Sequence, residues 1–233
     1  MKPSSFFLLL ASAAAVPAAA AAPAGKSAPA RVDWARTVVA TPEGGFRMGN
    51  PAAKVKLVEY GSLTCGHCAA FAKAGMQSLV GNYVRTGKVS YEYRNFILNG
   101  LDVAATLVAR CGGAGRFFPV ADALYATQDQ WKDRVKNLTD AQKQALNALP
   151  ENQRLGRLAE LAGIPRIVAR HGIAPASAKR CLEDRVAFDG LGKMNEAAGA
   201  LGVEGTPTFF LNGANIGPHS WESLEPALRE AAG

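Results

Sequence analysis

Two cysteines separated by two residues, Cys65 and Cys68, lie where a predicted strand meets a predicted helix. Residues 55–60 are a short run typical of a strand, and residues 61–64 form a turn. Apolar residues then recur at helical spacing to about residue 85. The first turn of a helix has unpaired N–H groups and a partial positive charge, which favour a thiolate at Cys65. The position therefore indicates a redox dithiol.

His67 lies between these cysteines and adds a positive charge or a hydrogen bond when protonated. A stabilised thiolate is a good leaving group, so the disulfide form becomes a stronger oxidant. A zinc site is disfavoured because it needs four ligands, and Cys111, Cys181, His171 and His219 lack partners at ligand spacing. No metal is expected. A purely structural disulfide is a weaker interpretation, because so tight a loop rarely has a structural purpose.

A second strand is predicted over residues 89–96, which completes a strand–helix–strand unit. From residue 101 to about residue 200 the chain is rich in Ala and Leu at helical spacing. Breaks in that pattern predict about four to six helices there.

The last part of the chain returns to strands. Residues 206–211 predict a strand, Asn212 and Gly213 a tight turn, and residues 215–217 its partner strand. Residues 220–232 predict a final amphipathic helix capped by Ser220. The fold class is therefore α/β, with the sheet-forming parts interrupted by an all-helical insertion.

Residues 1–22 are typical of a cleaved signal peptide. Lys2 supplies the positive end, residues 6–16 are apolar, and an Ala run offers cleavage sites. The alternative, an uncleaved membrane anchor, needs about 20 strongly apolar residues, whereas this stretch is mostly Ala. Export predicts a soluble mature protein in an oxidising compartment, where disulfides persist.

The chain carries a net charge of +7, from 26 Lys and Arg against 19 Asp and Glu. Most of the excess positive charge lies in residues 132–180, which contain ten basic and four acidic residues. Nucleic-acid binding would need interleaved aromatic residues or a known motif, so it is not expected. The basic region predicts a solvated helical surface, and contact with anionic membranes or acidic unfolded substrates is a further hypothesis.

Four features together carry a family resemblance. They are the Cys65-Gly66-His67-Cys68 motif at the strand–helix junction, Glu59 six residues before it, the Gly205-Thr206-Pro207-Thr208 segment, and the helical block between the two halves. From about residue 46 onward the chain resembles the DsbA family of exported thioredoxin-fold thiol:disulfide oxidoreductases. The resemblance places the thioredoxin-like halves at residues 46–100 and 195–233, with the helical insertion at 101–194. Residues 23–45 are then a flexible lead-in.

The resemblance implies an enzyme in which Cys65 is attacked and Cys68 leaves, with His67 beside them. It implies that Glu59 is buried near Cys68 and relays its proton. It also implies a cis bond at Pro207, which leaves the Thr206 backbone free to pair with an extended substrate. No cofactor is implied. The implied partners are reduced exported proteins and a quinone-linked membrane reoxidant of the DsbB type, and the implied location of the monomer is the periplasm.

Two residues depart from the strongest oxidants of this family. Gly66 replaces their proline and resembles protein disulfide isomerase, and Thr206 stands where they often have valine. An isomerase or reductase kept in the reduced state is therefore the alternative within this fold. A non-catalytic exported holdase is the alternative from another class. The expected reduction potential is about −180 to −120 mV.

The other two cysteines, Cys111 and Cys181, both fall in the helical block. Four cysteines allow three pairings, and the C-x-x-C motif accounts for one pair. Some branches of the family have an extra disulfide in the insertion, so a structural Cys111–Cys181 bond is expected after export. Two buried free thiols and a second redox pair are the alternatives.

Overall fold

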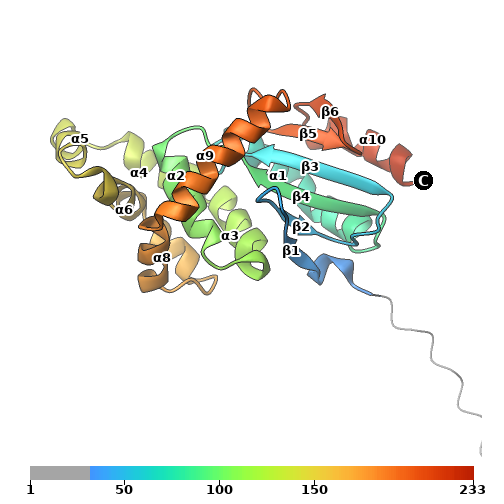
Figure 1. Cartoon of the computed structure of the whole chain (residues 1–233), viewed down its shortest axis with the longest axis horizontal. Coiled ribbons are helices and arrows are strands. Elements are labelled where there is room, and N and C mark those ends of the chain that lie inside the picture. Colours follow the sequence, from blue (N-terminus) through green and yellow to red (C-terminus); the bar gives the residue numbers. More distant parts are fainter. Residues whose placement is uncertain (1–31) are drawn as a thin grey trace, which may run out of the picture. The chain divides into compact units, whose positions relative to one another are not determined.

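The computed structural model describes residues 32–233, so the predicted signal peptide and residues 23–31 of the predicted lead-in lie outside the described residues. The elements alternate as the sequence predicts, with a strand–helix–strand unit, a helical block, and a strand–strand–helix unit (Figure 1). This arrangement confirms the predicted α/β fold class. The strands are β1 (Val38–Ala40), β2 (Phe46–Met48), β3 (Val55–Gly61), β4 (Val89–Asn95), β5 (Thr208–Leu211) and β6 (Ala214–Gly217).

The six strands form one sheet in the order β1-β2-β4-β3-β5-β6. The central strands β3 and β4 are parallel, as expected for strands joined through a helix, and every other pair is antiparallel. At the β5–β6 turn Asn212 and Gly213 both have positive φ, 49° and 87°. Asn and Gly tolerate this backbone better than other residues, which explains why the turn is readable from the sequence.

The segment before β2 differs from the prediction of a flexible lead-in. A 3₁₀ turn covers Trp34–Arg36, and β1 pairs with β2, with Val38 opposite Met48. Asp33 caps the turn by accepting a hydrogen bond from the Ala35 N–H at 3.2 Å. A three-residue edge strand is too short for an alternating pattern to reveal it. Residues 38–40 of the predicted lead-in therefore belong to the sheet.

The helical block contains eight helices, more than the four to six expected. Three of the breaks, at Thr127, between α4 and α5, and between α8 and α9, occur without the Gly or Pro on which the prediction of breaks depends. The last helix also runs across residue 194, the predicted end of the insertion. The eight are α2 (Gly100–Arg110), α3 (Ala114–Ala126), α4 (Gln128–Lys136), α5 (Asp140–Asn147), α6 (Glu151–Ala162), α7 (Ile164–Ala169), α8 (Pro175–Leu182) and α9 (Arg185–Ala200).

Alternate residues of β3 pack into two different clusters. Val55 and Leu57 belong to the main core together with residues of α1 (Gly66–Ser78) and α10 (Trp221–Ala232). Tyr60 belongs to a smaller cluster with Ala198 of α9. A π-helical segment, Leu79–Val84, extends α1. Because β3 and β4 are parallel, both strands end at the same edge of the sheet, and the two cysteines follow β3 directly, at the start of α1.

Candidate active site

Cys65 is the N-cap of α1, and its sulfur accepts a hydrogen bond from the Cys68 N–H at 3.4 Å. Its thiol also donates to the Thr206 carbonyl at 3.2 Å. The hydrogen bond from the Cys68 thiol is the largest of several effects that lower the pKa of Cys65 to about 5. Burial opposes the shift, and the N–H groups at the helix start support it. Cys65 is half-buried, so a substrate sulfur can reach it.

Cys68 has the opposite environment, because its side chain is fully buried beneath Cys65. Burial raises the pKa of Cys68 well above its ordinary value, and the hydrogen bond to Cys65 and the charges of Glu59 and Cys65 act in the same direction. In the reduced protein the pair therefore consists of an outer thiolate and an inner thiol.

Glu59 lies on β3 with its carboxyl group inside the core, 2% exposed. Tyr91 of β4 donates a hydrogen bond to its Oε2 at 2.6 Å. Burial raises the pKa of Glu59 to about 8, against the lowering effect of the Tyr91 hydrogen bond. A cavity of about 10 Å³, close to the size of one water molecule, borders Glu59 and Tyr91. Glu59 is thus a buried acid that can exchange a proton near neutral pH.

Replacing Glu59 with glutamine is expected to remove a pH dependence of stability. Between about pH 4.5 and 8 the unfolded chain releases the Glu59 proton, whereas the folded chain retains it. The free energy of unfolding therefore falls as the pH rises through this window, by up to about 1.4 kcal/mol per pH unit. Glu59→Gln lacks this fall and should gain stability over the wild type with rising pH. Urea unfolding across the window measures the difference.

A substitution on the surface is the control for this comparison. Glu196→Gln changes an exposed carboxyl on α9 and should follow the wild-type pH profile. If the free energy of unfolding of Glu59→Gln also changes with pH as that of the wild type does, from pH 4.5 to 8.5, the assignment of a raised pKa to Glu59 is wrong.

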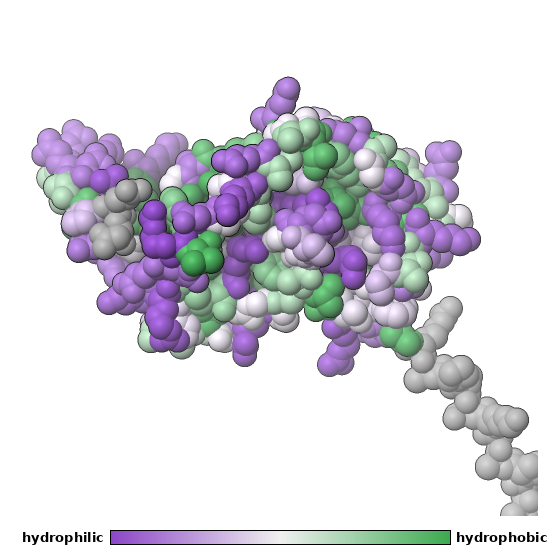
Figure 2. Space-filling view, viewed as in Figure 1, coloured by the Kyte–Doolittle hydropathy of each residue, from purple (hydrophilic) through white to green (hydrophobic). Residues whose placement is uncertain are grey.

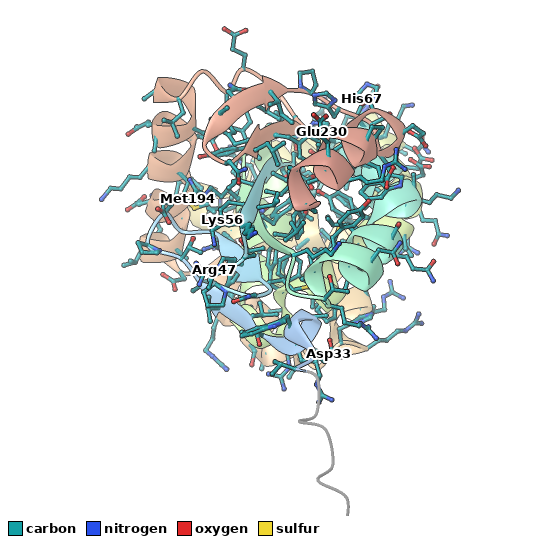
Figure 3. All side chains as sticks on the ribbon, turned by 90° about the vertical axis from the view of Figure 1, so that its right-hand side faces the viewer. Asp33, Arg47, Lys56, His67, Met194 and Glu230 are labelled. Atoms are coloured by element: carbon teal, nitrogen blue, oxygen red, sulfur yellow. A yellow bond between two sulfur atoms is a disulfide. The ribbon has the colours of Figure 1, made fainter. Side chains whose placement is uncertain are left out.

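The Thr206–Pro207 peptide bond is cis, and Pro207 is buried directly before β5. The hydrogen bond between the Cys65 sulfur and the Thr206 carbonyl joins residues 141 positions apart in the sequence. The fold therefore brings the cysteine motif and the cis-proline segment together. The hydroxyl oxygen of Thr206 is buried with no hydrogen-bond partner. His67 is exposed at the start of α1, and Figure 3 shows it at the edge of the molecule.

Cys111 and Cys181 form a disulfide with an S–S distance of 2.05 Å and a Cα–Cα distance of 5.8 Å. The bond links the end of α2 to α8, both within the insertion. Across residues 32–233 the structure places no three His, Cys, Asp or Glu side chains where they could share a metal ion. In the same region no helix is long and apolar enough to cross a bilayer.

Asp102, near the start of α2, is a fully buried carboxylate that no motif in the sequence identifies. It accepts hydrogen bonds from the Ser62 hydroxyl at 2.6 Å and from the Leu63 N–H at 3.0 Å, in the loop before Cys65. Burial raises the pKa of Asp102 to about 6, although these hydrogen bonds lower it. Asn99 caps the same helix through the Asp102 N–H. An Asn three residues before an Asp signals a helix start, but it does not reveal what the Asp binds.

Comparison with known proteins agrees with this geometry. The thioredoxin family model matches residues 41–230. A Rickettsia felis protein, provisionally named a protein-disulfide oxidoreductase, is 30% identical over 79% of this chain and 59% of its own length. The chain thus spans about three fifths of the length of the curated relatives it matches first.

Solved structures are similar over nearly their whole length. A protein-disulfide isomerase from Novosphingobium aromaticivorans has a TM-score of 0.75 and 32% identity, with 81% of this chain and 97% of that chain covered. The alpha-DsbA1 protein of Wolbachia pipientis has a TM-score of 0.66 and 21% identity, with 83% and 93% covered.

Proposed function

Because this chain belongs to the thioredoxin family and has a DsbA-like fold, we propose that it is an exported thiol:disulfide oxidoreductase that forms disulfide bonds through Cys65 and Cys68. The observation that carries the proposal is the difference between the two sulfurs. The pKa of Cys65 is lowered to about 5 by the Cys68 thiol and the helix start, whereas burial raises that of Cys68. Such a pair releases the outer sulfur easily and holds a proton on the inner one.

In the proposed reaction a substrate thiolate attacks the Cys65 sulfur of the Cys65–Cys68 disulfide. The bond between the two enzyme sulfurs breaks, and Cys68 leaves and takes a proton, for which Glu59 is the nearby donor. A second substrate thiolate then attacks the substrate sulfur of the mixed disulfide, and Cys65 leaves as a thiolate. The substrate loses two electrons and gains a disulfide, and the enzyme is reduced to the dithiol.

The proposed substrates are reduced exported proteins, and the proposed reoxidant is a quinone-linked membrane protein of the DsbB type. A quinone accepts the two electrons of the dithiol and restores the Cys65–Cys68 disulfide. The proposed location is the periplasm, which follows from the signal-peptide prediction for residues 1–22. Thiol trapping of the two cysteines in intact cells tests this cycle: an oxidised pair supports the oxidase.

An isomerase or reductase is the second candidate, and two observations favour it. The Novosphingobium aromaticivorans protein with 32% identity is named a protein-disulfide isomerase, and Gly66 precedes His67 as in that class of enzyme. An isomerase must be kept reduced, so a reduced pair in cells would support this candidate over the oxidase.

The reduction potential is expected at about −180 to −120 mV, because a stabilised Cys65 thiolate favours the dithiol form. Equilibration of the purified protein with glutathione buffers, followed by alkylation and mass spectrometry, measures it. A value near about −270 mV, typical of thioredoxin, would contradict the oxidase proposal.

A further inference from the structure

The loop that leads into α1, residues 62–65, is held by side chains of the helical insertion. All four of its backbone carbonyls accept a hydrogen bond from the insertion. The donors are the Tyr125 hydroxyl of α3 and the side chains of Gln128 and Lys132 of α4. A carbonyl that binds a fixed donor loses its freedom to rotate, so the insertion fixes the backbone from which Cys65 projects.

Gln128 makes two of these contacts with a single nitrogen. Its Nε2 donates to the Leu63 carbonyl and to the Cys65 carbonyl, both at 2.9 Å. The side chain is 3% exposed, so water cannot replace these hydrogen bonds without opening the structure. The Cys65 carbonyl also accepts from the Ala69 N–H in the first turn of α1. Gln128 therefore holds the turn of helix whose N–H groups face the Cys65 sulfur.

Lys132 lies one helical turn after Gln128 and brings a positive charge to the same loop. Its Nζ donates to the Thr64 carbonyl at 2.8 Å and to the Gln128 Oε1 at 3.4 Å. The Thr64 carbonyl carbon is bonded to the Cys65 nitrogen, so the ammonium group lies within one peptide group of the Cys65 backbone. A nearby positive charge favours the thiolate form of a cysteine.

We propose that Gln128 and Lys132 are positioning residues through which the helical insertion stabilises the Cys65 thiolate and sets the oxidising strength of the pair. Both act through the backbone of residues 62–65. The inference rests on the proposed function in taking Cys65 as the attacked sulfur. It adds that the insertion contributes to the chemistry as well as covering the site.

Lys132→Met tests the charge and keeps the side-chain stem. In the reduced full chain we expect it to raise the pKa of Cys65, measured by thiolate absorbance against pH, by about 0.5 to 1. The equilibrium constant for oxidation of the dithiol by oxidised glutathione should rise about 3- to 10-fold, because each pKa unit is worth a factor of ten. Lys132→Arg keeps the charge and should stay within about twofold of the wild type.

Gln128→Leu tests the backbone contacts. Leucine has a similar size but no amide group, so both hydrogen bonds from Gln128 Nε2 are lost. The pKa of Cys65 and the equilibrium constant for oxidation by glutathione should both rise, as they do for Lys132→Met. Because the substitution removes the hydrogen bond to the buried Leu63 carbonyl, its folding is checked by circular dichroism, and the Lys132 variants decide the question if it does not fold.

Matched controls lie on the same helix. Lys136→Met and Gln130→Leu change exposed side chains of α4 and should leave both measurements at wild-type values. The inference is overturned if Lys132→Met matches the wild type, or if Lys136→Met shifts the pKa as much as Lys132→Met does.

The wild type separates the inference from the proposed function. If its Cys65 titrates near the ordinary thiol value of 9.0, the proposed function loses its support. If the wild type titrates near 5 and the Lys132 variants do too, only the role of the insertion is wrong.

Discussion

Replacing Cys65 with serine is expected to lower the rate of disulfide transfer to a reduced peptide by more than about a thousandfold. The variant has no Cys65–Cys68 disulfide to donate, and a serine hydroxyl cannot replace a thiolate of pKa about 5. The measurement is the oxidation of a two-cysteine peptide by the pre-oxidised protein, followed by mass spectrometry.

Variants of Cys68 are the matched comparison, because Cys68 has two roles. It is the leaving group when the disulfide is attacked, and its thiol lowers the pKa of Cys65. Its thiol makes the largest contribution to the low pKa of Cys65. Cys68→Ala should therefore raise the pKa of Cys65, whereas Cys68→Ser keeps a hydroxyl donor and should retain part of the lowering. Neither variant can resolve a mixed disulfide at Cys65 by the internal route, so captured substrates should accumulate. If Cys65→Ser oxidises the peptide as fast as the wild type, Cys65 is not the attacked sulfur and the proposed reaction is wrong.

Removing the Cys111–Cys181 disulfide is expected to lower the free energy of unfolding by about 2 to 4 kcal/mol. The two cysteines are separated by 70 residues. A disulfide that closes a loop of that length lowers the entropy of the unfolded chain, which stabilises the folded state by about 4 kcal/mol in the chain-entropy model. Strain in the native disulfide reduces this stabilisation. Urea unfolding followed by tryptophan fluorescence, to which the buried Trp131 of α4 contributes, measures the difference.

The comparison is made in a Cys65→Ala/Cys68→Ala background, so that only the second pair differs. In that background Cys111→Ala/Cys181→Ala should match the parent treated with a reducing agent. If the stability is unchanged in this background, while the same substitutions alter the reduction potential in the chain with its active cysteines, the second pair is regulatory.

Local patterns predicted the parts of the fold that depend on neighbouring residues. The dithiol at a helix start, the Asn212-Gly213 turn and the strand–helix–strand unit each span few residues, and the sequence shows them directly. The short β1 strand and three of the helix breaks are not predictable in this way, because the strand is too short for a pattern and the breaks lack Gly and Pro.

The contacts of the insertion with the active-site loop lie beyond such patterns. Gln128 binds carbonyls 63 and 65 residues away, and nothing in its neighbourhood identifies those partners. The sequence predicts Lys132 as one charge of a solvated basic surface, whereas its ammonium group binds the Thr64 carbonyl. Figure 2 shows hydrophilic side chains gathered over α5 and its neighbours. The prediction of a solvated surface therefore suits other basic residues of the 132–180 region. The spacing of residues reveals which face of a helix is apolar. Which donor binds which acceptor depends on how the helices and loops pack together.

The position of β3 has a consequence for the order in which the protein can assemble during synthesis. Its partner β4 begins 34 positions after β3 does, whereas β5, on its other side, follows only after the whole insertion. As the chain emerges from its N-terminus, one edge of the central strand stays unpaired until residues 208–211 appear. An open strand edge invites pairing with other chains. Until then Cys65 also lacks the Thr206 carbonyl, so the dithiol exists as a local motif well before it becomes a complete site.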